Sequence, residues 1–379
     1  METRNAAKKL FYLKDKNVLL LKITCLFWLI AKLMSWKIWT TYRSLPTAPF
    51  FEWFDHLPAV MHTILFVLSL LLIIVLFFRQ NTFLLTGLLV VEVLSCLLDQ
   101  SRWLPWEYLY VFIIFVFIVN AASPKYIAPA IAFLLISTYF YSGLCKLNEG
   151  FLNVVWTNMI LTRFLRVPAN ISGQSWVHYS GYLFGLTELL AGIGLFFVKT
   201  QARSAKYLIV MHLGVLLLLG PFGFQGYEVL WPWNTAMILF LYFVFLENKD
   251  GVLVFQTITY RWNKLVLVCW GILPVLSFWG YWDKNLSSNL FSANLPGMII
   301  CVRDTSACRQ LQRFCYKKDS RNICNGQAKI DIQTWARLET NVSVYPEMRV
   351  YKIIQEKLAK QYGQAGFSFV YFTAWNKKQ

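Results

Sequence analysis

The chain has 379 residues, of which 57% are hydrophobic and 15% are charged. This composition excludes an ordinary soluble domain and favours a polytopic membrane protein. The net charge of +17 would suit a nucleic-acid-binding protein, but the basic residues are scattered between apolar runs. Positive cytoplasmic loops and attraction to anionic lipid head groups explain these residues more simply. We therefore expect a lipid bilayer, and no nucleic acid, as the partner.

Residues 1–17 form a basic N-terminal segment without a cleavable signal pattern. An apolar run follows directly, so we expect an uncleaved signal anchor with a cytoplasmic N-terminus. The basic residues of this segment are Arg4, Lys8, Lys9, Lys14 and Lys16.

Residues 18–282 form the predicted transmembrane domain, since about 20 apolar residues make one crossing. The turns after the second, fourth, sixth and eighth spans carry lysine or arginine, which predicts that they are cytoplasmic and that the C-terminus is external. Arg102, Arg163 and Arg166 fall on the external side and count against this topology. The predicted fold class is an all-α polytopic membrane protein with about nine spans, at 18–40, 59–78, 82–98, 107–122, 126–145, 177–198, 206–223, 228–247 and 264–282.

The stretch between the fifth and sixth predicted spans is too short and too polar for a further crossing. Its apolar residues Phe151, Val154, Val155 and Met159 recur at helical spacing. This pattern predicts an amphipathic helix that lies in the external interface. An ordinary connecting loop is the alternative interpretation.

Residues 283–379 contain no predicted span and have the composition of a soluble domain, large enough to fold alone. The runs LPGMIICV and FSFVYFTAW predict strands. The runs TSACRQLQRFCYKK and MRVYKIIQEKLAKQYG predict helices. We therefore expect a small α+β extracytoplasmic domain.

The cysteines of this domain, Cys301, Cys308, Cys315 and Cys324, suggest two disulfides. Zinc is the competing interpretation, but the domain sequence has no C-x2-C spacing and no histidine, so no metal site is predicted. A helix would place Cys308 and Cys315 about 10 Å apart along its axis, too far for a bond. Each of these two is therefore expected to pair with Cys301 or Cys324.

Ionisable residues inside spans are expensive to bury, which makes each a candidate for function. Glu92, Glu188 and His212 fall in predicted spans, and each also fits simple packing between helices. Lys146 lies where the fifth span ends. It is either an interface anchor whose amine reaches the head groups or a reactive amine.

Two polar stretches accompany Lys146 on the predicted external side. LDQSRWLPWEYLY carries Asp99 and Glu107, which we expect to hold the Lys146 amine, although Arg102 with either carboxylate would also make an ordinary interface ion pair. The second stretch carries His212, Glu228 and Asn234, in the run MHLGVLLLLGPFGFQGYEVLWPWN. The predicted pocket around Lys146 comprises Asp99, Arg102, Trp103, Glu107, Tyr139, His212 and Asn234.

Three motifs resemble vitamin K-dependent gamma-glutamyl carboxylases and the bacterial HTTM branch of that superfamily. YFYSGLCKLNEGF is similar to the carboxylase stretch that carries the catalytic base, and the catalytic lysine maps to Lys146. LDQSRWLPWEYLY looks like a second motif, with Leu98, Asp99, Trp103, Tyr108 and Tyr110 matching. The third element is matched by Gly220, Pro221, Trp231, Pro232, Trp233 and Asn234. The resemblance covers the membrane portion, roughly residues 18–282.

The resemblance implies a quinol-linked oxygenase or carboxylase with Lys146 as the base. A menaquinol or a vitamin K-type hydroquinone would reach the site from the lipid and be oxygenated. Its alkoxide would then remove a proton from the γ-carbon of a glutamate, and the carbanion would add carbon dioxide. The bacterial type of motif implies a bacterial inner membrane with the C-terminal domain in the periplasm. Trp106 stands where the carboxylases have a histidine.

Two other functions fit the same sequence. The first is a non-catalytic membrane subunit or anchor of an envelope protein complex, whose external domain binds a protein partner. The second is a lipid or quinone binder without turnover. A quinone beside Lys146, His212 and Asn234 would favour the enzyme, whereas a large apolar face on the external domain would favour the partner-binding subunit.

Overall fold

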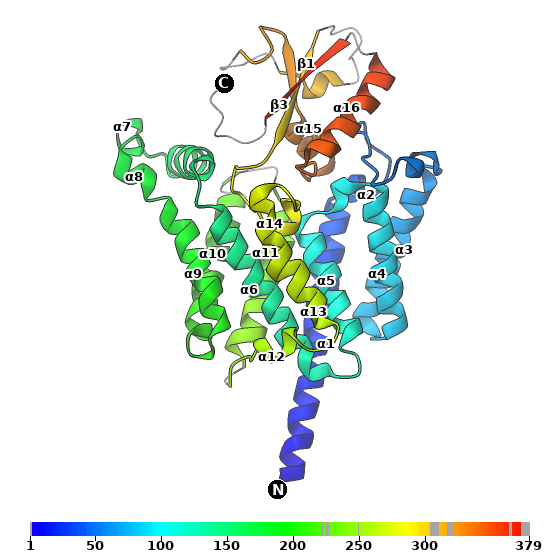
Figure 1. The fold of residues 1–379 in the computed structure, drawn as a ribbon, viewed down its shortest axis with the longest axis vertical. Helices are drawn as coiled ribbons and strands as arrows, with labels where there is room; N and C mark the ends of the chain where they lie inside the picture. The colour runs from blue at the N-terminus through cyan, green and yellow to red at the C-terminus, as the bar shows by residue number, and fades with distance from the viewer. Residues whose placement is uncertain are drawn as a thin grey trace.

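The computed structural model describes residues 2–220, 223–224, 227–248, 250–303, 311–316, 322–363 and 366–372. Of the site and disulfide residues discussed above, Pro221 and Cys308 lie outside these ranges. A bundle of helices carries a small sheet-bearing domain at one end, and α1 (Glu2–Met34) extends from the other end (Figure 1). The start of α1 and the sheet therefore lie at opposite ends of the bundle.

In the described part of the chain, five helices are long and apolar enough to cross a membrane, since about 20 residues at about 1.5 Å each span the hydrocarbon core. They are Asp15–Met34 within α1, Val60–Phe78 (α3), Pro124–Cys145 with α6 (Ile127–Cys145), Ser175–Phe196 with α8 (Ser175–Tyr179) and α9 (Tyr182–Phe196), and Val198–Leu219 (α10).

Four further apolar helices are shorter, with 10–17 residues. They are α4 (Thr82–Leu98), α5 (Pro105–Val119), Leu230–Leu246 with α11 (Leu230–Leu241) and η5 (Tyr242–Leu246), and Asn263–Trp279 with α13 (Asn263–Val266), η6 (Leu267–Ile272), α14 (Leu273–Leu276) and η7 (Ser277–Trp279). Every predicted span overlaps one of the long or short apolar helices. A membrane crossing by the four shorter helices stays a prediction.

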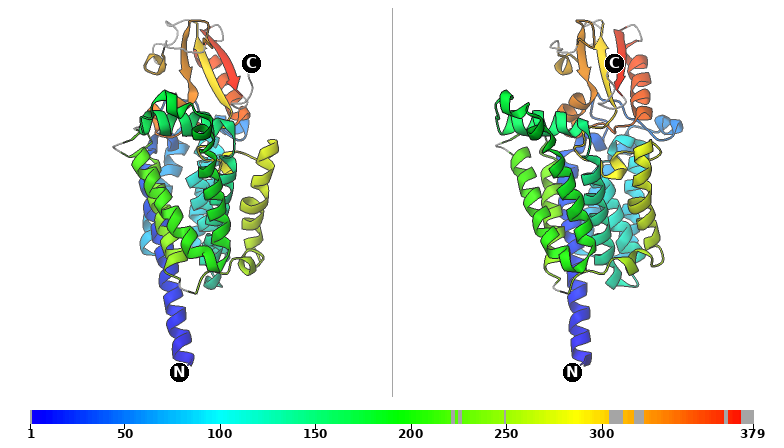
Figure 2. Two further views of the ribbon diagram at one scale, coloured as in Figure 1. Left: turned by 90° about the vertical axis from the view of Figure 1, so that its left-hand side faces the viewer. Right: turned by 60° about the vertical axis from the view of Figure 1, so that its left-hand side comes forward.

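Short elements shape the turns at both ends of the bundle. Near the sheet-bearing domain, a π-helix, η4 (Phe151–Phe164), follows α6 and lies across the bundle, seen end-on in Figure 1 and side-on in Figure 2. The predicted amphipathic helix is therefore present, with Phe151 and Val155 buried. The other short elements are α2 (Trp36–Trp39), η1 (Glu52–His56), η2 (Gln100–Arg102), η3 (Pro124–Tyr126), α7 (Ala169–Ser172), α12 (Phe255–Ile258) and η8 (Asn285–Ser287).

Burial differs sharply between the central and the outer helices. The segment Pro124–Cys145 is 83% buried, whereas Val60–Phe78 is 28% buried and Val198–Leu219 is 22% buried. A water-exposed helix would carry polar residues on its outer face, but these outer helices present apolar side chains. Their surfaces are therefore suited to lipid, and α6 forms the centre of the bundle.

The C-terminal domain, residues 297–372, is built on an antiparallel sheet of order β2-β1-β3. Alternation along β1 (Gly297–Val302) turns Met298, Ile300 and Val302 toward a buried cluster shared with α15 (Ile332–Thr340) and α16 (Met348–Tyr362). The predicted strands at β1 and β3 (Phe367–Phe372) and the predicted helix at α16 are confirmed. β2 (Ala328–Asp331) and α15 were missing from the prediction.

The cysteine pairing differs from the prediction. Cys301 and Cys324 form a disulfide with each other, so neither pairs with Cys308 or Cys315, and the predicted pairing is wrong. Within the described residues of the run TSACRQLQRFCYKK, a single 3-10 turn at 311–314 replaces the predicted helix, and Tyr316 then bridges to Lys329 of β2. Backbone pairing with the sheet therefore overrides the local helical pattern.

The C-terminal domain shares its core with the loop between α2 and α3. Leu45 and Ala48 of this loop belong to the same buried cluster as Trp335 of α15. Glu339 of α15 accepts hydrogen bonds from the Ser44 N–H at 2.8 Å, the Ser44 hydroxyl at 2.6 Å and the Leu45 N–H at 2.9 Å. The domain is therefore joined to the bundle through a common core and not only through its chain connection.

The contacts of Glu339 predict that the stability of the folded protein depends on pH. Burial alone would raise the pKa of Glu339, but hydrogen bonds from Ser44, Leu45 and Trp335 lower it below the ordinary value of 4.5. A depressed folded-state pKa gives stability that is present above the unfolded pKa and is lost as the pH falls through the folded value. We predict that stability falls as the pH drops below about 4.5 and that Glu339→Gln removes this dependence.

Thermal unfolding in detergent over a pH series measures this effect. At neutral pH we expect Glu339→Gln to lower stability by about 1–3 kcal/mol, because it weakens a charge-assisted network. Glu356→Gln, at an exposed position of α16, is the control. It should change neither the stability at neutral pH nor its loss at acid pH. An acid-induced loss of stability that is the same in both variants would contradict the assignment to Glu339.

Candidate functional site

The Lys146 amine turns back toward the bundle from the end of α6. Lys146 is the first residue after α6, and its Nζ donates to the Ser142 carbonyl at 3.2 Å and to the Ser142 hydroxyl at 2.6 Å. The same nitrogen lies 2.6 Å from Glu188 Oε2 of α9. The two charged side chains are 13% and 6% exposed. The amine is therefore held inside the protein and does not reach outward as an interface anchor would.

Glycines bring α6 and α9 together at this point. A Cβ atom built on Gly143 would lie 2.4 Å from the Leu189 backbone nitrogen and 2.7 Å from the Gly185 carbonyl oxygen. A Cβ atom on Gly192 would lie 2.8 Å from the Phe140 nitrogen. Small residues let helix backbones approach closely in this way. The close contact places Glu188, one turn after Gly185, beside Lys146.

A second polar group lies next to this ion pair. Tyr139, two turns before Lys146 on α6, has its hydroxyl 2.7 Å from His212 Nε2 of α10. His212 Nδ1 lies 2.7 Å from Asn234 Oδ1 of α11, and Asn234 Nδ2 donates to the Leu230 carbonyl at 2.8 Å. Three helices therefore contribute one continuous chain of hydrogen bonds.

Both polar groups line one cavity of about 440 Å³. The walls are mainly apolar, and the polar residues in the lining include Lys146, Glu188, Tyr139, His212 and Asn234. The π-helix η4 covers one side of the cavity. Its wider turn brings residues four to five apart to a common face, and that face consists of Phe151, Val155, Met159, Ile160 and Phe164.

The structure brings Lys146, Tyr139, His212 and Asn234 together as the sequence predicts, but not the rest of the predicted pocket. Trp103 lies against Tyr108, with ring centroids 6.0 Å apart, and its carbonyl accepts a hydrogen bond from Asn285. Asp99 and Glu107 make no contact with Lys146, so the prediction that they hold its amine is wrong. Glu188 takes that role.

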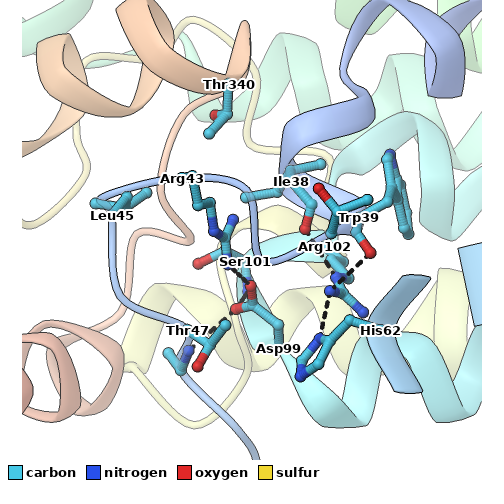
Figure 3. A network of polar contacts seen from close by, with 12 residues as sticks. Ile38, Trp39, Arg43, Leu45, Thr47, His62, Asp99, Ser101, Arg102 and Thr340 are labelled. Atoms are coloured by element: carbon cyan, nitrogen blue, oxygen red, sulfur yellow. Dashed lines mark hydrogen bonds and ion pairs between the residues drawn. The ribbon is translucent and has the colours of Figure 1, made fainter. Parts of the chain in front are cut away.

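Asp99 and Arg102 fix the turn between α4 and α5 instead (Figure 3). Arg102 is fully buried, and its guanidinium donates to the carbonyls of Ile38, Trp39 and Ser95. These carbonyls lie at the ends of helices α2 and α4, where backbone acceptors are left over. Its Nη2 also lies 2.6 Å from His62 Nδ1. Arg102 therefore has a structural role. Because it is buried and not in an exposed loop, it does not count against the predicted topology.

Asp99 completes this network by anchoring the loop before α3. It forms an ion pair with Arg43 and accepts hydrogen bonds from the N–H groups of Ala48 and Ser101, at 3.2 and 3.1 Å. Burial alone would raise the pKa of Asp99, but the charges of Arg43 and Arg102 lower it below its usual value. The motif LDQSRW thus has an architectural role.

Glu107 belongs to a third polar cluster, inside the bundle. Lys32 Nζ of α1 lies 2.8 Å from Glu92 Oε2 and 3.6 Å from Glu107 Oε1, and all three side chains are fully buried. Trp28 donates to Glu107 Oε2 at 2.6 Å, and Ser69 donates to Glu92. Lys32 is absent from the predicted site. Lys32 lies within the first apolar run, where burying a charge is costly, and this position could have identified it as a candidate.

Comparison with protein-family models, with curated proteins and with solved structures finds no match to this chain. The fold and the site therefore define its class by themselves. The chain is a helical bundle of membrane-suited composition, with an apolar cavity that ends in an ion pair and a hydrogen-bonded tyrosine and histidine. The resemblance to the carboxylases stays a hypothesis based on the motifs.

The contact between α6 and α9 predicts the effect of a single methyl group. In Gly143→Ala the new Cβ would meet backbone atoms of α9 at 2.4 and 2.7 Å, so the helices must separate. We expect a loss of about 1–3 kcal/mol of stability, as for other overpacked cores. Thermal unfolding in detergent measures it. Gly87→Ala in α4, where a Cβ meets nothing within 4 Å, is the control and should be neutral or stabilising.

The buried cluster around Lys32 predicts a larger loss of stability than the Gly143→Ala substitution. Lys32→Met removes the cation between Glu92 and Glu107 and leaves uncompensated carboxylates, which costs about 3–5 kcal/mol in comparable sites. Folded yield and thermal unfolding measure this loss. Lys22→Met, at an exposed position of the same helix, is the control. Adding Glu92→Gln to Lys32→Met should recover part of the lost stability. A double variant that is less stable than Lys32→Met would refute the pairing of Lys32 with Glu92.

Proposed function

We propose that the chain is an integral membrane enzyme that binds a hydroquinone-type lipid, such as a menaquinol, beside Lys146 and removes a proton from its hydroxyl. The observation that carries this proposal is the inward position of the Lys146 amine in a mainly apolar cavity of about 440 Å³. This volume lies in the range of about 300–1,000 Å³ that is usual for small-molecule sites. An apolar ring and chain fit the walls, and a hydroxyl fits the polar end.

The surroundings of the cavity support entry from the lipid. Phe184 of α9 and Tyr207 and Val210 of α10 line the cavity and are 45%, 40% and 67% exposed on the outside of the bundle. The same side chains therefore face both the cavity and the surface suited to lipid. A lipid-soluble ligand can enter between these two helices without passing through water.

Glu188 makes the role of Lys146 as a base chemically coherent. The Glu188 carboxylate lies 2.6 Å from the Lys146 amine, within reach of a direct proton transfer. Transfer of the proton from Lys146 to Glu188 removes both charges from the apolar cavity, which offsets the cost of leaving the ion pair. The neutral amine then accepts the proton of a ligand hydroxyl. Glu188 is thus the acceptor that takes the Lys146 proton, and the ligand hydroxyl supplies the proton that restores the ammonium.

The orientation that we propose is a bacterial inner membrane with a cytoplasmic N-terminus and a periplasmic C-terminal domain. Basic residues at the turns on the side where α1 begins support it, since cytoplasmic loops are enriched in lysine and arginine. These residues include Arg79, Lys125, Arg203 and Arg261. Arg102, which the sequence places on the other side, is fully buried and donates to the carbonyls of Ile38, Trp39 and Ser95.

The alternative function, a non-catalytic envelope subunit, has less support. It requires an apolar docking face on the C-terminal domain. Among the described residues of this domain, the large apolar side chains that are exposed are Tyr316 and Leu338. Two separate side chains do not make such a face.

The test is Lys146→Met, which keeps most of the apolar stem and removes the amine. We expect the variant to fold like the wild type and to lose about 10²–10⁴-fold in menaquinol-4-dependent carbon dioxide fixation or quinol oxygenation. Lys125→Met, at an exposed lysine, is the control. Mass spectrometry of lipids bound to the purified protein shows whether a quinone occupies the cavity. Full activity of Lys146→Met would refute the base role, and absence of any bound quinone would refute the ligand.

A further inference from the structure

Tyr139, His212 and Asn234 face the cavity but have no role in the reaction proposed above. We propose that they form a second proton acceptor, in which His212 takes up the proton of a phenolic hydroxyl through the Tyr139 hydroxyl. This inference rests on the proposed function, because it assigns the ligand class as a lipid-soluble ring compound with a phenolic hydroxyl. It adds an acceptor that is distinct from Lys146.

The hydrogen bonds of this chain have one consistent direction. Asn234 Nδ2 donates to the Leu230 carbonyl at 2.8 Å, which orients the amide so that Oδ1 faces His212. An amide oxygen only accepts, so His212 Nδ1 carries a hydrogen. In the neutral imidazole the other nitrogen, Nε2, is then an acceptor, and the Tyr139 hydroxyl donates to it at 2.7 Å. Asn234 thus fixes the histidine tautomer that accepts a proton on the cavity side.

The Tyr139 oxygen is placed to receive a proton from the ligand. Its hydrogen is engaged by His212, while its lone pairs remain able to accept, since a phenolic oxygen both donates and accepts. Tyr139 lines the same wall as Ser142, which is three residues later, or about 4.5 Å along the helix axis. Because Lys146 Nζ is hydrogen-bonded to Ser142, the two acceptors lie about one turn apart. A single ring can therefore contact both.

The proposed step moves one proton and no electrons. The O–H bond of the ligand breaks, and its proton passes to the Tyr139 oxygen as the tyrosine proton passes to His212 Nε2. The products are a phenolate ligand, a neutral Tyr139 and an imidazolium whose Nδ1–H stays bonded to Asn234. The phenolate and the imidazolium balance each other in charge, which an apolar cavity requires.

The titratable groups around His212 act in both directions on a positive imidazolium. Among the described residues these groups are Tyr139 and Lys146 of α6 and Glu188 of α9, while α11 contributes the neutral Asn234. While the ion pair with Lys146 is intact, the Glu188 carboxylate stabilises a positive imidazolium, whereas burial and the Lys146 ammonium oppose it. The same ammonium stabilises the phenolate. The site thus holds both products of the proton transfer, and neither is left as an unpaired charge.

The experiment follows the ionisation of a bound phenol, 4-nitrophenol, whose phenolate absorbs at longer wavelength than the neutral form. The probe is titrated over pH with the full-length protein in detergent, and menaquinone-4 is used to displace it from the cavity. We expect the apparent ionisation of bound probe to shift to lower pH by at least about one unit, a tenfold change in the ionised ratio. Tyr139→Phe and His212→Gln keep most of the side-chain volume and should each abolish the shift.

The outcomes separate the relay from the proposed function. A shift that survives in both variants, with the probe still displaced by menaquinone-4, overturns the relay and leaves ligand binding at Lys146 intact. Failure of the wild type to bind either the probe or menaquinone-4 overturns the proposed function and the relay together. Thermal unfolding identifies a variant that has lost its fold, and the other variant then decides the result. Loss of the shift in a folded variant supports the relay.

Discussion

The candidate site depends on the close approach of α6 and α9. Without side chains at Gly143 and Gly185, the two backbones come near enough for Glu188 to reach the Lys146 amine at 2.6 Å. That contact holds the amine against the cavity, whereas a lysine at the end of an apolar helix otherwise extends toward water and head groups. Helix packing therefore determines the geometry of the site, because the two glycines lie within one turn of Lys146 and Glu188.

Charges inside the bundle serve two different purposes. Lys32 and Arg102 are surrounded by acceptors and fully buried, so their environments stabilise a single arrangement of α1, α4 and α5. Lys146 has one ion-pair partner and borders an open space, so its environment can change when a ligand enters. The number of partners around a buried charge, more than its burial, distinguishes the structural clusters from the candidate site.

The position of each apolar helix along the chain was predictable from the sequence, and its neighbours in the bundle were not. Apolar runs and basic turns indicate where each helix begins and ends, which explains why the apolar helices overlap the predicted spans. Tyr139 and Lys146 share a helix face, so their proximity follows from spacing. Asp99 and Glu107 were expected beside Lys146 but pair with Arg43 and Lys32 instead. Glu188 was recognisable as an ionisable residue in an apolar run, but it lies 42 residues from Lys146 in the chain and nothing in its local pattern identifies its partner. Only the packing of α9 on α6 selects the partner.

The anchoring of Ser44 and Leu45 by Glu339 has a consequence for biosynthesis. The two partners are separated by 295 residues in the chain, so the loop leaves the ribosome long before its acceptor does. Throughout synthesis of the bundle, the Ser44 and Leu45 N–H groups must bond to water or to a chaperone. The loop reaches its final structure only after α15 has been made and has packed against it. The structure of the loop between α2 and α3 is thus completed by a helix that is made long after it.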